Sequence, residues 1–298
     1  MKRFTGIQTR FKIFREDNDE EVTDLLGYRT EISYDIMFNV ENREDIGSGA
    51  TLQEAVDNIV DISVDLSCEA PSLAVVSLMG ELSNGEVELS EFLPYLRAEI
   101  QVMEDKYLEI TGLKLDDLSL SSSVDNVVFE VDFGNGLATN VELKDGQVEY
   151  SEPGDKPASA LDMVCFIDGE EIGSVQNFDI SYSRSIESQR GIQSYEEGER
   201  RLPDEITEGY MELSWDFDVE TTKDSDVLFD KAFDSEDGSL ADYSTEKNVK
   251  LMIGDEYIEI SGCKVDSIGS TIGLDGEEPV VLNLFGEGRE AVIVLGGE

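Results

Sequence analysis

Histidine is absent from this 298-residue chain, and cysteine occurs three times at widely separated positions, Cys68, Cys165 and Cys263. Without histidine there is no Ser-His-Asp or Cys-His catalytic arrangement, and a zinc site built from cysteine and histidine is excluded. No cysteine belongs to a C-x-x-C pair. We therefore expect buried free thiols in a reducing compartment.

Basic residues are scarce and long apolar runs are missing. The chain has 22 Lys and Arg against 68 Asp and Glu, which gives a formal net charge of −46. This argues against binding to free DNA, because phosphate contacts need clustered Lys and Arg. No apolar run approaches the roughly 20 residues of a membrane-spanning helix. The basic start has no apolar stretch behind it, so we expect no secretory signal and no membrane partner.

Acidic residues are what the chain has in excess. An acidic excess can indicate disorder, but 13 Phe, 10 Tyr and regular apolar alternation indicate a folded chain. A charge of −46 makes the chain repel itself at low ionic strength, whereas molar salt shortens the Debye length to about 3 Å and screens this repulsion. The composition therefore favours a halophilic protein that folds in a salt-loaded cytoplasm.

The sequence repeats itself at a spacing of about 150 residues. Residues 105–119 (DKYLEITGLKLDDLS) match residues 255–269 (DEYIEISGCKVDSIG), with Lys114 matching Lys264. Shorter matches follow in the same order: Glu31–Tyr34 with Asp179–Tyr182, Ile62–Leu66 with Leu213–Phe217, and Phe133–Gly136 with Phe285–Gly288. A spacing this long indicates two duplicated domains rather than a solenoid of short repeats.

The duplication predicts the domain organisation. Residues 1–150 form repeat one and residues 161–298 form repeat two, joined by a linker at 151–160 that contains Pro153 and Pro157. Apolar and polar residues alternate in many short segments, which predicts strands. Examples are Tyr107–Thr111, Val127–Phe133 and Met211–Phe217.

We predict a mainly β chain of two tandem β-sandwich or part-barrel domains, each with a short flanking helix. The helix of repeat one is predicted at Pro71–Met79 and that of repeat two at Val227–Phe233, after acidic capping residues. A capping-box pattern at Thr51–Glu54 predicts a further helix.

No arrangement of residues predicts catalysis. Among 68 acids, pairs of carboxylates occur everywhere, so their presence carries no information about a catalytic site. Asp234–Gly238 lacks the alternating ligands and closing Glu of a calcium loop, so we interpret it as a solvated turn. Gly134–Gly136 and Gly286–Gly288 do not open helices and are interpreted as tight turns. We predict no enzyme activity, no cofactor and no metal.

One segment is nearly neutral within this acidic chain. Between residues 184 and 201 lie four arginines and four glutamates. Two interpretations stay open. The segment is either a loop with local ion pairs, each of which contributes little to stability, or a contact surface whose arginines pair with carboxylates of a neighbouring subunit. The candidate interface residues are Arg184, Arg190, Arg200, Arg201 and Pro203.

Repeat two resembles phage major tail tube proteins. The resemblance rests on Ser174–Tyr182, the polar loop, the Arg-x-Pro-x-x-Ile-x-x-Gly run of Arg201–Gly209, the strand Tyr210–Phe217 and Asp255–Lys264. It covers nearly all of residues 161–298 and reaches residues 1–150 through the duplication. Repeat one lacks the Arg-x-Pro run at Glu41–Thr51, so its loop is expected to be shorter or to serve another purpose.

The resemblance implies a structural virion protein whose rings stack into a tail tube through which viral DNA is ejected. Rings of that family usually carry six domains, so a duplicated chain implies a homotrimer with pseudo-sixfold symmetry. It also implies tape measure, baseplate and terminator proteins as partners, DNA passing through the lumen without specific binding, and assembly in the host cytoplasm. The salt signature points to a tailed virus of a halophilic archaeon.

Two other classes of protein stay open. One is a secreted or cell-surface tandem β-sandwich of a halophile, such as an adhesin or a surface-layer protein. The other is a carbohydrate-active or calcium-dependent enzyme that uses carboxylates, for which two buried acids would face each other about 5 to 10 Å apart.

Overall fold

The computed structural model describes residues 10–43, 54–83, 85–89, 92–123, 129–149, 163–189, 202–221, 246–271 and 281–295. The strands of the first half are β1 (Phe11–Arg15), β2 (Glu20–Glu21), β3 (Tyr28–Arg43), β4 (Glu54–Ala70), β5 (Glu81–Ser83), β6 (Glu86–Glu88), β7 (Leu96–Met103), β8 (Lys106–Leu113), β9 (Asp117–Ser123), β10 (Phe129–Leu137) and β11 (Asn140–Asp145). Those of the second half are β12 (Met163–Ile167), β13 (Glu170–Gln189), β14 (Glu205–Thr221), β15 (Lys247–Ile253), β16 (Glu256–Thr271), β17 (Val281–Gly288) and β18 (Glu290–Val294).

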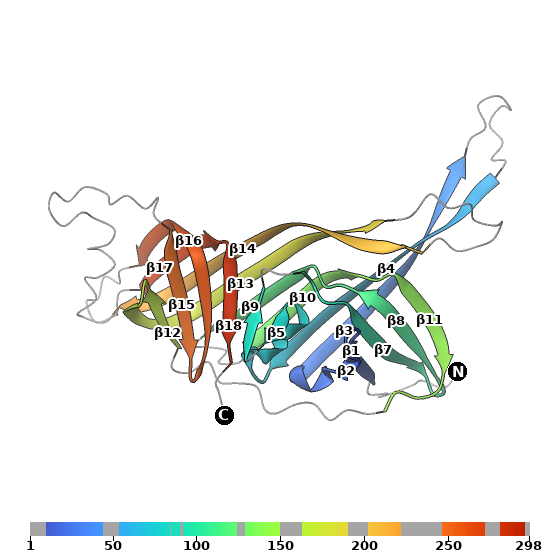
Figure 1. The fold of residues 1–298 in the computed structure, drawn as a ribbon, viewed down its shortest axis with the longest axis horizontal. Helices are drawn as coiled ribbons and strands as arrows, with labels where there is room; N and C mark the ends of the chain where they lie inside the picture. The colour runs from blue at the N-terminus through green and yellow to red at the C-terminus, as the bar shows by residue number, and fades with distance from the viewer. Residues whose placement is uncertain are drawn as a thin grey trace.

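The prediction of a mainly β chain is confirmed. Within the described residues the strands form a five-stranded sheet in the order β11-β8-β7-β1-β2 and a thirteen-stranded sheet that contains strands of both halves (Figure 1). In the second half the pairing closes on itself, because β12, β13, β14, β17, β16 and β15 follow one another around a circuit. This circuit agrees with the predicted part-barrel architecture.

Alternation along the strands produces the core. In β14, for example, Leu213, Trp215 and Phe217 are buried while the residues between them point to the other face of the sheet. The three cysteines are buried, as expected. Burial raises the pKa of Cys68 and of Cys165 to about 12, which keeps these thiols protonated and unreactive.

Two long hairpins extend from this core. One is formed by β3 and β4, and the other by β13 and β14, which pair as far as Gln189 opposite Glu205. In Figure 1 the β13–β14 hairpin runs from the second half across the strands of the first half. It therefore links the two halves of the chain.

The structure differs from the prediction at the segments expected to be helical. Within Pro71–Met79 a 3-10 helix, η2 (Leu73–Leu78), replaces the expected regular helix, and the Ser72 side chain accepts a hydrogen bond from the backbone of Ala74. Consecutive β-branched residues disfavour an α-helix here. The helix predicted at Thr51–Glu54 is wrong at Glu54, which begins β4 opposite Arg43, because pairing with β3 outweighs the local capping pattern. Residues 51–53, 222–245 and the 151–160 linker lie outside the described residues.

The glycine-rich segments are not turns, which corrects the prediction. Gly134–Gly136 lies within β10 at a bulge, and Gly286–Gly288 lies within and ends β17. A Cβ atom at Gly286 would lie 2.3 Å from the Lys264 carbonyl oxygen and 2.7 Å from the Trp215 ring. Glycine is required there for close approach of the strand to the indole ring rather than for a turn.

The strand register shows that two of the short sequence matches are displaced by two residues from the structurally equivalent positions. Lys114 lies opposite Leu137, and its match Lys264 lies opposite Glu287, so Gly136 corresponds to Gly286 and not to Gly288. Gly136 lies opposite Val64 and Gly286 opposite Trp215. Tyr34 is the β3 partner of Val64, whereas Ile180 is the β13 partner of Trp215. Tyr34 therefore corresponds to Ile180. A two-residue shift keeps each side chain on the same face, so alternation alone does not reveal it.

Candidate assembly interface

The two halves of the chain join edge to edge. Strand β9 of the first half pairs antiparallel with β13 of the second half, with Leu118 opposite Tyr182 and Leu120 opposite Ile180. All four side chains are buried. At the end of this ladder the backbone nitrogen of Arg184 donates to the carbonyl of Asp116 over 2.7 Å. A sheet edge that would otherwise be open is thus closed by the other half of the molecule.

A second pair of edges meets at another place in the thirteen-stranded sheet. Strand β6 of the first half pairs with β18 of the second, and Ile293 lies opposite Val87 with both side chains buried. Backbone hydrogen bonds extend this contact, from Leu89 to Ala291 over 3.1 Å and from Leu295 to Gly85 over 2.9 Å. The two halves therefore share sheets at two separate places.

A buried ion cluster fixes the β13–β14 hairpin on the first half. Glu208 of β14 has a side chain only 5% exposed, and it forms ion pairs with Lys114 Nζ and, over 3.1 Å, with Arg184 Nε. Its carboxylate also accepts a hydrogen bond from the backbone nitrogen of Leu93 over 3.2 Å. The Lys114 ammonium lies 4.1 Å from the centre of the Tyr95 ring. Several partners thus compensate the burial of these charges.

The structure describes two of the five predicted interface residues, Arg184 and Pro203. Arg184 is not in a loop but in β13, which continues to Gln189, and its ion pair is with Glu208 of the same chain. This agrees with the local ion-pair interpretation for Arg184. Pro203 is buried just before β14. Arg190, Arg200 and Arg201 lie outside the described residues, so their role stays a prediction.

Sequence reasoning missed Glu208 and Lys114 as interface residues. Lys114 belongs to the longest repeated block, and Glu208 belongs to the run after Pro203, so both were in segments already singled out. Nothing in the sequence indicates that residues 94 positions apart form a pair. Only the crossing of the hairpin over the first half brings them together.

One face of the large sheet carries acidic and hydroxyl side chains across both halves. Cross-strand pairs place residues on one face, and the pairing connects Ser67, Asp132, Ser119, Ser181 and Ser214 in one row. A neighbouring row connects Glu69, Glu130, Ser121, Asp179 and Asp216. Basic side chains lie at the two ends of this face, where Arg29 pairs with Glu69 over 2.7 Å and Lys264 is opposite Glu287.

Burial and neighbouring carboxylates raise the pKa of two acids on this face, Asp216 and Asp117. Partial burial raises the pKa of Asp216, and the nearby Asp218 and Asp179 raise it further. Burial likewise raises the pKa of Asp117, with additional effects of Asp132 and Asp179. These acids lie on both sides of the junction between the halves, so the junction is a place of like-charge repulsion.

Asp116, at the end of the β9–β13 junction, makes stability depend on pH. Burial raises its pKa from 3.8 to about 6, and the Asp117 charge adds to this. The folded chain therefore binds this proton more tightly than the unfolded chain, so stability falls as pH rises from about 4 to about 6 and stays lower above. We expect Asp116→Asn to stabilise the protein at pH 8 by about 1 kcal/mol, an amount discounted because the side chain is partly exposed.

Urea unfolding at pH 8 and pH 4 in molar salt measures this effect. The gain from Asp116→Asn is expected at pH 8 and is expected to be small at pH 4, where the carboxyl is protonated. Asp255→Asn, at an exposed position in a turn, is the matched control and is expected to change little at either pH. An equal gain from Asp116→Asn at both pH values would contradict the assignment.

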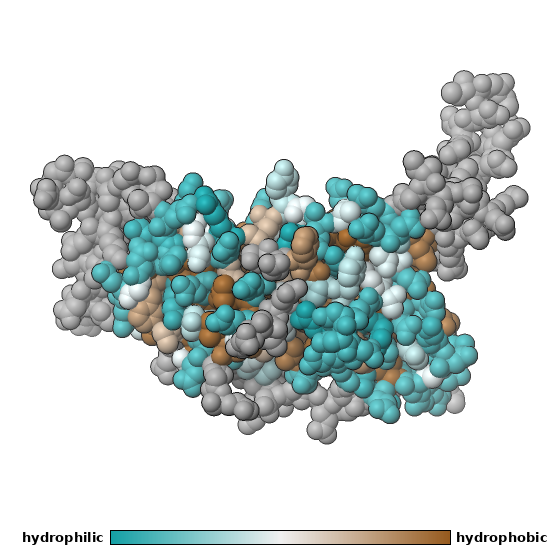
Figure 2. All heavy atoms as spheres, viewed as in Figure 1, coloured by the Kyte–Doolittle hydropathy of each residue, from teal (hydrophilic) through white to brown (hydrophobic). Residues whose placement is uncertain are grey.

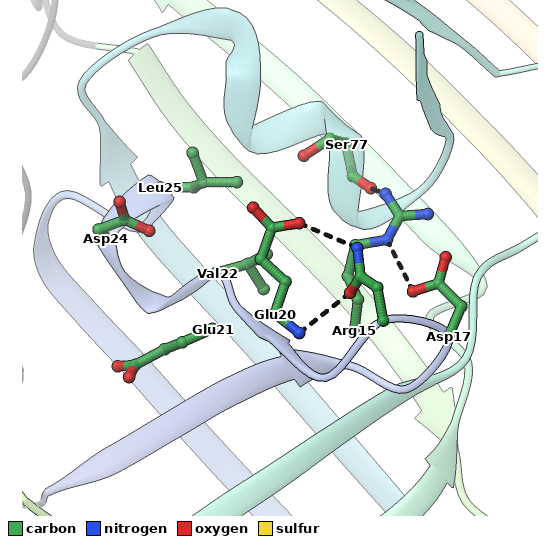
Figure 3. A pocket seen from close by; sticks show the side chains of 9 residues that line it. Arg15, Asp17, Glu20, Glu21, Val22, Asp24, Leu25 and Ser77 are labelled. Atoms are coloured by element: carbon green, nitrogen blue, oxygen red, sulfur yellow. Dashed lines mark hydrogen bonds and ion pairs between the residues drawn. The ribbon is translucent and has the colours of Figure 1, made fainter.

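A depression near β1 is one of the cavities formed by the described residues (Figure 3). It has a volume of about 350 Å³ and is lined by Arg15 together with Asp17, Glu20, Glu21 and Asp24. The Arg15 guanidinium donates to the carbonyl oxygens of Ser77 and Gly80, both over 3.2 Å. Arg15 thus holds the end of η2 in place, which is a structural role. Among the described residues, no group of three or more Cys, Asp or Glu side chains is arranged to hold a metal ion.

The face of the molecule in Figure 2 is largely hydrophilic, as the composition requires. No helix in the described part of the chain has the length and apolar character needed to cross a membrane. Comparison with protein-family models gives no match, and neither does comparison with curated protein sequences.

Proposed function

We propose that this protein is the major tail tube protein of a tailed virus that infects a halophilic archaeon. The observation that carries the proposal is the acidic face of the thirteen-stranded sheet, which continues across both halves without interruption at their junction. A sheet with its core on one face and a polar, acidic wall on the other is suited to line a channel. The protein acts as a structural component and not as an enzyme.

An acidic wall suits the passage of DNA. Duplex DNA carries one negative charge per roughly 1.7 Å of its axis, and basic walls hold it by counterion release. Ser119, Ser181, Asp179 and Asp216 at the centre of the face present no positive charge to phosphates. Phe285 is the partly exposed aromatic residue opposite Asp216, where a single strand would find a surface for stacking. A duplex, with its bases paired, passes without such contacts.

The resemblance to tail tube proteins implies rings of six domains, so the proposed ring has three chains, with the two repeats of each chain in alternating positions. The equal order of strands in the two halves supports this arrangement, because near-equivalent domains are what a pseudo-sixfold ring requires. Rings would stack into a tube that ends at terminator and baseplate proteins and encloses the tape measure protein. Arg190, Arg200 and Arg201, which lie between β13 and β14 in the sequence, are proposed to contact an adjacent ring or subunit.

Electron microscopy of concentrated protein in molar salt tests the proposal. We expect rings or stacked tubes, and native mass spectrometry of released rings is expected to give three chains of 33.0 kDa. Isolated monomers in molar salt at high concentration would contradict the tube and favour the cell-surface alternative. Rings with six chains would contradict the pseudo-sixfold arrangement.

Charge reversal on the acidic face tests its role as a channel wall. Asp179 and Asp216 lie opposite each other and are exposed, so Asp179→Lys with Asp216→Lys places lysines on the proposed wall. We expect the variant assembly to retain short duplex DNA at about 0.1 M salt, whereas the wild-type assembly retains none. The matched control is Glu104→Lys with Asp255→Lys, at exposed turn positions. Equal retention of DNA by both variants would contradict a special role of this face.

A further inference from the structure

Each half of the chain contains the same four-strand order. In the first half it is β3-β4-β10-β9, and in the second it is β13-β14-β17 followed by the second part of β16, residues 264–271. The registers given above make Tyr34 the counterpart of Ile180, and therefore Ile36 the counterpart of Tyr182. The β9 residue Ser119 lies opposite Asp132, and Gly269 lies opposite Asn283, so Gly269 is the counterpart of Ser119.

The outer edge of β13 is paired with the other half of the chain, whereas the corresponding edge of β3 is not paired with any described strand. The outer edge of β13 is covered by β9, and Ile180 and Tyr182 beneath it are 2% and 0% exposed. The corresponding edge of β3 has no partner among the described strands. Its Tyr34 is 38% exposed, and Ile36 is only partly buried. The second part of β16, the counterpart of β9, pairs with β17 alone within the described residues.

The same asymmetry appears at the second junction between the halves, that of β6 with β18. Ile293 in β18 is 1% exposed because β6 of the first half pairs with it. Its counterpart in β11 is Leu143, since Leu143 lies opposite Leu108 as Ile293 lies opposite Ile258. Leu143 is 53% exposed at the outer edge of the five-stranded sheet. An exposed leucine is thus found where the other half buries an isoleucine.

Two lysines at equivalent positions of the two halves show the same asymmetry in burial. Lys114 is 6% exposed because the β13–β14 hairpin covers it, whereas Lys264, in the matching sequence block, is exposed. The β3–β4 hairpin is the counterpart of the covering hairpin, and Figure 1 shows it extending away from the core. Among the described residues, the exposed or partly exposed counterparts are therefore Tyr34, Ile36 and Leu143 on the first half and Lys264 on the second.

We infer that a second copy of this chain covers the exposed counterparts on the first half. It does so by pairing its β16, at residues 265–271, antiparallel with β3. The register copied from the internal junction puts Ser270 opposite Tyr34, Gly269 opposite Asp35 and Ile268 opposite Ile36. The same copy covers Leu143. This inference deepens the proposed function by naming the interface between chains, although pairing of edges does not itself require a tube. Open edges with partly exposed apolar side chains favour such pairing.

Engineered disulfides test the register. Asp35→Cys with Gly269→Cys joins different chains if the inference is right, and oxidation in molar salt is expected to give covalent dimers and trimers on a denaturing gel. Ser119→Cys with Ser181→Cys is the matched control, because this equivalent pair closes within one chain. Asp35→Cys with Asp255→Cys is the mismatched control. Monomers alone from the first variant, while Ser119→Cys with Ser181→Cys closes, would overturn the inference.

A substitution provides a second, independent test. Leu143→Glu is expected to raise the protein concentration at the midpoint of assembly by about tenfold or more, because a buried leucine becomes a buried charge. Met103→Glu is the control, since Met103 is 56% exposed but lies at a hairpin end. Equal effects of both substitutions in sedimentation velocity would count against the interface.

The outcomes separate this inference from the tail-tube proposal. Cross-linked rings that never stack into tubes would contradict the tube and leave the interface in place. Tubes that assemble without cross-links at Asp35 and Gly269 would overturn the interface and leave the tube in place.

Discussion

Transfer from molar salt to about 10 mM salt is expected to lower the melting temperature by about 5–10 °C and to dissociate assemblies. The Debye length grows from about 3 Å to about 30 Å in this range, so the net charge of −46 is no longer screened. Asp179 and Asp216 lie directly opposite each other, and like charges in that position destabilise a sheet. A loss of about 5 kcal/mol, summed over such pairs, gives a shift of this size in a chain of this length.

Trp215 provides the measurement. It is the one tryptophan of the chain and is fully buried in the second half, so its fluorescence reports unfolding there, while far-UV circular dichroism reports all strands. Sucrose at low salt is the control, because it favours the compact state without screening charge. A melting temperature that is the same at both salt concentrations would contradict the halophilic interpretation.

Glu208→Ala is expected to lower the free energy of unfolding by about 3–5 kcal/mol. Removing this carboxylate leaves Lys114 and Arg184 without the partner that compensates their burial, and an uncompensated buried charge has a cost of this order. The side chain of Glu208 is 5% exposed, so salt screens the pair little. The loss is therefore expected to persist in molar salt, unlike the effects of surface charges.

Urea unfolding in molar salt, followed by Trp215 fluorescence, measures this loss. The matched control is Glu212→Ala, which removes an exposed glutamate from the same strand and is expected to change stability by about 0.5 kcal/mol or less. Combining Glu208→Ala with Lys114→Met removes both charges, and we expect it to recover part of the loss. Equal losses from Glu208→Ala and Glu212→Ala would show that the cluster does not anchor the hairpin.

Much of the local structure was predictable because it depends on neighbours in the sequence. The alternation in Tyr107–Thr111 and Met211–Phe217 predicted strands, and both segments lie in strands, β8 and β14. The capping pattern at Thr51–Glu54 failed because a local hydrogen-bonding preference of about 1 kcal/mol is weaker than pairing along a long hairpin. The glycines of β10 and β17 were misinterpreted because close packing between strands, such as that of Gly286 against Trp215 and of Gly136 against Leu115, leaves no local signal.

The sequence by itself determined the mainly β character, the burial of the cysteines and the acidic surface, since each depends on composition or on a period of two. Only the tertiary structure decided the register and the edges that meet. Tyr34 and Ile180 became counterparts through pairing across strands, because a two-residue shift leaves the alternation unchanged. Lys114 and Lys264 lie in matching blocks, yet one is buried and the other exposed. The difference arises because the β13–β14 hairpin covers Lys114, and a contact between distant segments is a property of the folded chain.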